Sequence, residues 1–299
     1  MMSGKYESMR KEIPIHGREG IVKLGALLEQ DFFDWDSFSV RYCLVDGTGM
    51  IPEETPKQHT HDYDQVLWFL SSDPNDMLHL GAEVEIDLGE EGIRHRFATP
   101  HTVTIPKGTP HFSPIVKDVK RPFFFLSVNC TGKLAAAVAD EAAQPGSGDW
   151  ARFFGKYSMN VHALNYGATD PYHYGAEHAQ DLGGYSTFFS GANSQINLTM
   201  AWSTVCNPGF LGPWGPDGRH MPHAHKDYEE ALIFLSMDLD NLTELHGEVD
   251  FCCGGPEEET EHYKLTKATV MAMQKDAWHL PLHFDKVDKP IVFITLGNH

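Results

Sequence analysis

Short apolar segments separated by turn signals recur along the chain. Examples are SVRYCLV, QVLWFL, AEVEIDL, HTVTIP and PFFFLSV, in which β-branched and aromatic residues are frequent. Turn sequences such as SSDPND, LGEEG and PKGTP lie between them. Helical periodicity is scarce, and many short strands with regular turn signals are typical of a β-sandwich or barrel. The pattern therefore predicts an all-β fold.

The second half of the chain repeats the pattern of the first half. Three pairs of segments match in the same order: 59–73 with 223–238, 81–86 with 246–251, and 110–128 with 278–296. The first pair, HTHDYDQVLWFLSSD and HAHKDYEEALIFLSMD, needs one additional residue after the second histidine of the later copy. Ordered matches of this kind indicate a duplicated domain, in which each copy is long enough for its own core.

The segment between the two copies predicts where the domains meet. KLAAAVADEAAQPGSGD at 133–149 begins as an alanine-rich helical stretch and ends in a turn sequence. A chain of 299 residues also exceeds what one hydrophobic core usually organises. We therefore expect an N-terminal domain at 1–145 and a C-terminal domain at 146–299.

The first copy holds histidines with the spacing of metal ligands. Residues i and i+2 of a strand share a face, so His59 and His61 can both point into a barrel. Gln65 follows as an oxygen donor, and His111 lies downstream in PKGTPHF. Three imidazoles and one oxygen can hold a divalent metal with positions left for water or substrate. The alternative for Gln65 is a polar residue that only orients a ligand.

The second copy has the same arrangement. His223 and His225 form the pair, and His279 follows in QKDAWHL. Glu230 takes the oxygen-donor position, because the apolar run ALIFL then aligns with VLWFL. Its neighbour Glu229 is the rival for this position. The sequence thus predicts one metal site in each copy.

His283 distinguishes the second copy, because Ile115 occupies the matching position of the first. It stands four residues after His279, so we expect it on the same strand face. An imidazole beside the metal can act as general acid or base. This asymmetry favours the C-terminal site as the catalytic one, with His283 and Glu230 as its catalytic residues; a structural role for His283 is the alternative.

These motifs resemble those of the cupin superfamily, in which HxH with a following Glu or Gln precedes a PxGxxH motif. PKGTPH at 106–111 fits the later motif, and both HxH pairs fit the earlier one. The sequence departs from the family pattern where Gln274, Lys275 and Asp276 replace the Pro-x-Gly turn, although Asp tolerates that turn geometry. The resemblance covers both halves. It implies a bicupin of two tandem cupin (double-stranded β-helix or jelly-roll) barrels, similar to a group of bacterial bicupins with an FLSxD…GxEV core.

Composition narrows the partners and the compartment. A formal net charge of −19 argues against nucleic acid and anionic membrane as partners, because both would be repelled. The five cysteines, Cys43, Cys130, Cys206, Cys252 and Cys253, are odd in number and scattered, so a reducing cytoplasm fits. No apolar stretch has the length of a membrane span or a signal sequence. We expect a cytoplasmic protein with a small-molecule substrate.

The resemblance implies a metalloenzyme that acts on a small carbonyl, enol or carboxylate compound. The divalent metal, Mn, Zn or Fe, would polarise the substrate oxygen as a Lewis acid in hydrolase, isomerase or lyase chemistry. A dioxygenase that cleaves a C–C bond is the first alternative, and a non-catalytic ligand-binding bicupin is the second. Arg41, Arg94 and Arg96 are candidates for binding an anionic substrate. Paired cupin barrels commonly associate, so a homo-oligomer is compatible with the resemblance.

Overall fold

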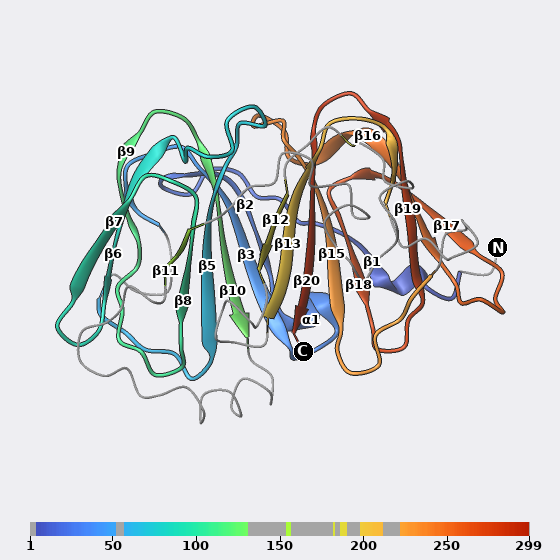
Figure 1. The fold of residues 1–299 in the computed structure, drawn as a ribbon, viewed down its shortest axis with the longest axis horizontal. Coiled ribbons are helices and arrows are strands. Elements are labelled where there is room, and N and C mark those ends of the chain that lie inside the picture. The colour runs from blue at the N-terminus through green and yellow to red at the C-terminus, as the bar shows by residue number, and fades with distance from the viewer. Residues whose placement is uncertain are drawn as a thin grey trace.

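The computed structural model describes residues 4–51, 57–130, 154–156, 182, 186–189, 198–211 and 222–298. Their strands form four antiparallel sheets, two in each half of the molecule (Figure 1). The described helices are the 3-10 turn η1 (Glu7–Met9) and α1 (Gln30–Phe33). None of the helices within these ranges is long and apolar enough to cross a membrane. The expected domain boundary after residue 145 lies outside the described residues.

The N-terminal half contains a six-stranded sheet and a four-stranded sheet that face each other. In hydrogen-bonded order the larger sheet comprises β11 (Phe154–Lys156), β8 (His101–Ile105), β5 (Asp64–Ser71), β10 (Phe123–Cys130), β3 (Phe38–Val45) and β2 (Val22–Leu28). The smaller sheet comprises β4 (Gly49–Met50), β9 (Ile115–Val119), β6 (Ala82–Leu88) and β7 (Ile93–Phe97).

The C-terminal half repeats this arrangement, as the duplicated sequence predicts. Its larger sheet comprises β1 (Arg10–Glu12), β18 (Thr269–Met273), β15 (Glu230–Ser236), β20 (Ile291–Asn298), β13 (Leu198–Val205) and β12 (Ser186–Phe189). Its smaller sheet comprises β14 (Gly209–Leu211), β19 (His279–Val287), β16 (Glu244–Cys253) and β17 (Glu261–Lys267). The halves exchange edge strands, because β1 pairs with β18 and β11 pairs with β8.

Both faces of the large sheets are apolar. On β5, Val66, Trp68 and Leu70 face the other half of the molecule. The alternate residues Leu67 and Phe69 face the small sheet of their own half. A strand buried on both faces shows a continuous apolar run instead of an alternating one, which explains the segment VLWFL.

A shared core joins the two halves. It lies between the two six-stranded sheets, which pack against each other in the middle of the molecule (Figure 1). Trp202 on β13 is fully buried there, with its ring 6.5 Å from Tyr42 on β3 and 5.4 Å from Phe124 on β10. Each half has in addition a core between its own two sheets.

The predicted all-β class is confirmed. The prediction of closed barrels needs one refinement, because the hydrogen-bonded sheets of the described residues remain open at their edges. Each half is therefore a sandwich of two sheets.

Candidate metal centre

Backbone pairing brings His59 and His111 side by side. Each donates its N–H to the carbonyl oxygen of the other at 3.0 Å. The ring centre of His111 lies 4.3 Å from that of His59 and 5.0 Å from that of His61. One ring nitrogen from each of the three histidines lies within 4.8 Å of the others. The structure thus brings together the three imidazoles that the sequence singled out in the first copy.

Hydrogen bonds fix which ring nitrogen faces the centre. The Nδ1 atom of His59 lies 2.9 Å from the carbonyl oxygen of Lys57, and that of His111 lies 3.0 Å from the carbonyl oxygen of Thr109. A carbonyl only accepts, so each Nδ1 carries the hydrogen and each Nε2 keeps its lone pair. Both Nε2 atoms are buried without a hydrogen-bond partner among the described residues. Burial, with the charges of His59 and His61, lowers the pKa of His111 to about 4, so its ring is neutral at neutral pH.

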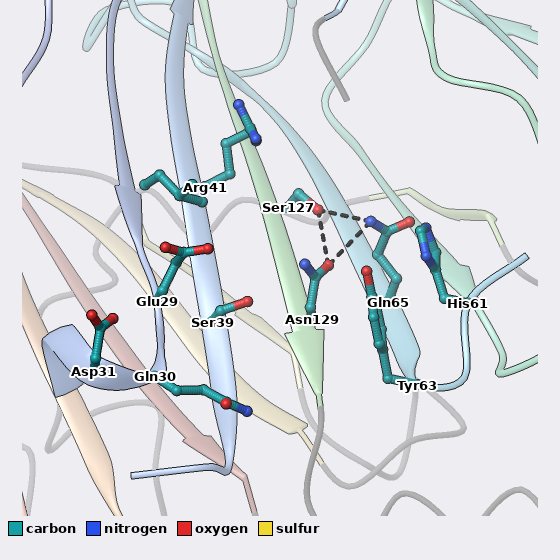
Figure 2. A pocket seen from close by; sticks show the side chains of 11 residues that line it. Glu29, Gln30, Asp31, Ser39, Arg41, His61, Tyr63, Gln65, Ser127 and Asn129 are labelled. Carbon is teal, nitrogen blue, oxygen red and sulfur yellow. Dashed lines mark hydrogen bonds between the residues drawn. The ribbon is translucent and has the colours of Figure 1, made fainter. Parts of the chain in front are cut away.

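The Gln65 amide is held with its oxygen toward the imidazoles. Its Nε2 donates to the Ser127 hydroxyl at 2.9 Å and to the Asn129 side-chain oxygen at 3.1 Å. Its Oε1 is buried without a hydrogen-bond partner within the described part of the chain. Figure 2 shows this oxygen on the side of His61. Two outer partners therefore orient the amide as a metal ligand requires.

A cavity of about 570 Å³ opens at this centre (Figure 2). His61 and Gln65 lie at one side of it, and Tyr63 stacks on the His61 ring at 4.6 Å. Arg41 and Glu29 are among the other lining residues. A concave site of this size with a few converging polar groups can enclose a small molecule.

Of the three arginines considered from the sequence, Arg41 is the one that lines this cavity. Its β3 neighbours Val40 and Tyr42 belong to the shared core, so Arg41 points to the other face, into the N-terminal sandwich. Arg94 and Arg96 instead form ion pairs with carboxylates on β6.

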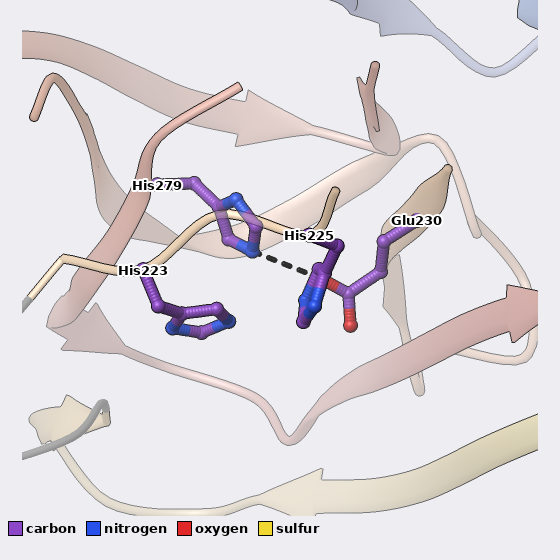
Figure 3. A group of neighbouring side chains, drawn as sticks. All are labelled: His223, His225, Glu230 and His279. Carbon is purple, nitrogen blue, oxygen red and sulfur yellow. Dashed lines mark hydrogen bonds and ion pairs between the residues drawn. The ribbon is translucent and has the colours of Figure 1, made fainter. Parts of the chain in front are cut away.

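The second copy builds its centre in the same way. His223 and His279 exchange backbone hydrogen bonds at 3.0 and 2.9 Å. The ring of His223 lies 4.9 Å from that of His225 and 4.4 Å from that of His279. Figure 3 shows Glu230 reaching toward the same point. Donor atoms from all four residues lie within 4.8 Å of one another.

Glu230 holds two of these imidazoles through one oxygen. Its Oε2 lies 2.9 Å from Nε2 of His279 and 3.2 Å from Nε2 of His225. Burial alone would raise the pKa of this carboxyl, but the two imidazole contacts outweigh it and hold the pKa well below its usual range. The rival Glu229 accepts a hydrogen bond from the Ser37 hydroxyl at 2.7 Å instead. The carboxylate at this centre therefore belongs to Glu230.

The turn before the third histidine is equivalent in both copies despite their different sequences. Gly108 has a φ of 75°, and Asp276 takes its place with a φ of 61°. The N–H of Gly108 donates to the carbonyl oxygen of His61, and the N–H of Asp276 donates to that of His225, both at 2.8 Å. Asp adopts this left-handed conformation more readily than most residues, which explains how the second copy keeps the turn without glycine.

His283 is not brought to the metal centre. Its neighbours Leu282 and Phe284 belong to the interior core, so His283 points to the outer face of the sheet, where its ring lies 5.8 Å from that of Phe210. The sequence expectation assumed strict alternation from His279 onward. A register shift between β16 and β19 inserts an extra β19 residue between His279 and Leu282, and this reverses the side on which later residues point.

Four residues of the two centres were not identified from the sequence. Tyr63 and Tyr228 stack on the second histidine of their HxH pairs, at 4.6 and 4.3 Å. Both could have been identified from the sequence, because a tyrosine follows the HxH pair in each copy, in HTHDY and in HAHKDY. Ser127 and Asn129 gave no such signal, because their role depends on the pairing of β10 with β5.

The donor atoms of both centres fit a divalent metal. Imidazole nitrogens with an amide or carboxylate oxygen suit Mn²⁺, Fe²⁺ and Zn²⁺. The buried Nε2 atoms of His59 and His111 and the buried Oε1 of Gln65 are the atoms that such an ion would satisfy.

The sequence matches no known protein-family description and no curated protein sequence. Solved structures share the fold. Oxalate decarboxylase from Bacillus subtilis has a TM-score of 0.54 at 12% identity, over 97% of this chain and 77% of that chain. AerE from Microcystis aeruginosa has a TM-score of 0.53 at 9% identity, over 97% of this chain and 98% of that chain. With two sandwiches in tandem, the chain therefore has a bicupin fold.

Proposed function

We propose that this protein is a metal-dependent enzyme that binds a small carboxylate in the N-terminal cavity. One observation carries the proposal: the converging imidazoles and the Gln65 oxygen lie beside a cavity of about 570 Å³ that Arg41 also lines. A divalent ion held by His59, His61, His111 and Gln65 would supply Lewis-acid polarisation of a substrate oxygen.

Arg41 supports a carboxylate as the substrate group. A guanidinium presents donors in a planar fork that matches the two oxygens of a carboxylate. Bacillus subtilis oxalate decarboxylase, which shares the fold, has Mn(II) centres and by its name acts on a dicarboxylate. This supports the same substrate class and Mn²⁺ as the first metal to test.

Groups in the cavity can carry protons during the reaction. The lining includes the carboxylates of Glu29 and Asp31 and the phenol of Tyr63. These groups lie in the substrate cavity, whereas His283 lies on an outer face, so we assign the proton transfer to the cavity groups. Ser127 and Asn129 hold Gln65 in place and also line the cavity.

The C-terminal centre is proposed as a second metal site. Its ligands are His223, His225, His279 and Glu230, and the carboxylate makes it more negative than the N-terminal centre by one charge. It is expected to bind a divalent ion more tightly, because an ionised oxygen donor attracts the cation more strongly than an amide oxygen does.

The test combines metal content with activity. His59→Ala with His61→Ala should remove metal from the first centre and abolish turnover of small carboxylates, followed as carbon dioxide or formate release. His223→Ala with His225→Ala should remove the other metal. Arg41→Lys should raise KM more than it lowers kcat, because the fork geometry is lost while the charge remains.

Other outcomes separate the alternatives. Oxygen uptake with diketone or enol substrates would replace the proposal by a dioxygenase. Native protein without metal, or turnover that survives loss of the first centre, would refute it.

A further inference from the structure

The outer face of the small C-terminal sheet carries a different cluster of donor atoms. Asp250 and Cys252 lie two residues apart on β16, and His262 lies opposite Cys252 on β17. Val249, which precedes Asp250, and Phe251, which lies between Asp250 and Cys252, point into the interior core. Because successive side chains of a strand alternate, Asp250 and Cys252 share the outer face.

The nitrogen-to-sulfur distance within this cluster matches that around a tetrahedral zinc ion. Nδ1 of His262 lies 2.8 Å from Oδ2 of Asp250 and 3.5 Å from Sγ of Cys252. With zinc–nitrogen and zinc–sulfur bonds of about 2.1 and 2.3 Å, the nitrogen and the sulfur bound to one zinc ion lie roughly 3.5 Å apart. The other oxygen of Asp250, Oδ1, is buried and has no hydrogen-bond partner in the described residues.

The corresponding positions of the N-terminal copy hold ion pairs between side chains. Glu85 and Asp87 occupy them on β6, and Arg94 donates to both carboxylate oxygens of Asp87 at 2.9 Å. Arg96 and Lys117 pair with Glu85. Side-chain cations therefore neutralise the carboxylates of this copy.

In the C-terminal copy two of these three cations are replaced, whereas Lys264 keeps the place of Arg96 opposite Asp250. Cys252 takes the position of Asp87. His262 lies opposite Cys252, where Arg94 lies opposite Asp87 in the first copy. The position of Lys117 is held by Asp285, whose charge is close enough to act on Cys252. Compared with the first copy, this cluster lacks two cations and gains a thiol and an imidazole.

We propose that Asp250, Cys252 and His262 bind a zinc ion on the outer face of β16 and β17. Sulfur, nitrogen and oxygen donors together select zinc over magnesium, calcium or manganese. His283 lies opposite Asp250 in the strand register, on the same outer face. The ion would tie β17 to β16 and supply the positive charge that Arg94 and Lys117 supply in the other copy.

Binding exchanges one proton for the metal. The Cys252 thiol releases its proton to solvent and its sulfur forms the bond to zinc, with no change in oxidation state. The side chain of His262 is 58% exposed, which gives the ion a path from solvent.

Cobalt spectroscopy on the full chain tests this site apart from the two cupin centres. Neither cupin centre contains a thiol, so a thiolate-to-cobalt charge-transfer absorption reports on this cluster alone. We expect wild-type protein titrated with Co²⁺ to develop this band, excess Zn²⁺ to abolish it, and Cys252→Ser to lack it. His262→Gln and Asp250→Asn should each weaken cobalt binding at least about tenfold.

Two controls make the result decisive. Cys206→Ser removes a thiol elsewhere and should leave the band unchanged. His59→Ala with His61→Ala should also leave it unchanged, so loss of the proposed enzyme activity and loss of this site are distinguishable. A wild-type protein without the band, or a band that survives Cys252→Ser in a variant with the wild-type circular dichroism spectrum, would overturn the proposal.

Discussion

The partners of Gln65 offer a sharp test of how the N-terminal centre is organised. Ser127→Ala with Asn129→Leu removes both acceptors of the Gln65 amide, which lie at 2.9 and 3.1 Å. A buried donor left without a partner costs about 1–3 kcal/mol, so the amide will turn its N–H₂ toward the cavity. Changes to residues that orient metal ligands lower metal affinity by about 10–100-fold, or roughly 1.4–2.8 kcal/mol.

The assay is calorimetric titration with Mn²⁺, which binds thiolates poorly. The double variant is placed in a His223→Ala/His225→Ala background, where manganese binding reports on the N-terminal centre. We expect the dissociation constant to rise by about 10–100-fold.

The matched control is the same double variant in a His59→Ala/His61→Ala background, where binding at the C-terminal centre should be unchanged. An unchanged dissociation constant in the first background, or an equal loss in both, would mean that Gln65 is not an oriented ligand.

Three further predictions address the other centre, pH and the core. Glu230→Gln should weaken metal binding at the C-terminal centre at least about tenfold in the same titration. Glu229→Gln is the control: Glu229 contacts the Ser37 hydroxyl and not the centre, so metal binding should be unchanged. In metal-free protein the folded pKa of His111, about 4, lies below its unfolded value of 6.5, so the unfolded state binds the proton first. Urea unfolding should therefore show stability falling as pH drops from 6.5 to 4, by up to about 3 kcal/mol, and a flatter profile for His111→Gln. Trp202→Ala should lower the free energy of unfolding by about 3–5 kcal/mol in the same assay, because Trp202 is fully buried. Leu78, whose side chain is 56% exposed, is the control, and Leu78→Ala should lower it by under about 0.5 kcal/mol. Equal losses of stability would contradict the shared core.

Much of the fold could be read from the sequence because its signals are local or repeated. β-branched and aromatic segments between turn residues give strands, whatever their partners. The match of 59–73 with 223–238 identified the duplication and both HxH pairs. Residues i and i+2 of a strand share a face, so the pairing of His59 with His61 followed from spacing alone.

The packing of the two halves was not readable in this way. Trp68 and Trp202 lie in one core between two sheets. The sequence of each strand indicates only that its sheet has an apolar face. Which apolar face meets which depends on contacts between distant segments, and no local pattern encodes them.

Strand register decided the rest of the site. A single extra residue in β19 sends His283 to the outer face, although it stands four residues after His279. The pairing of β10 with β5 gives Asn129 its role as the partner of Gln65. The sequence by itself therefore determined which residues can bind metal, because ligand chemistry belongs to the side chain. Only the tertiary structure decided which of them converge, because one residue of register reverses the direction of every side chain that follows.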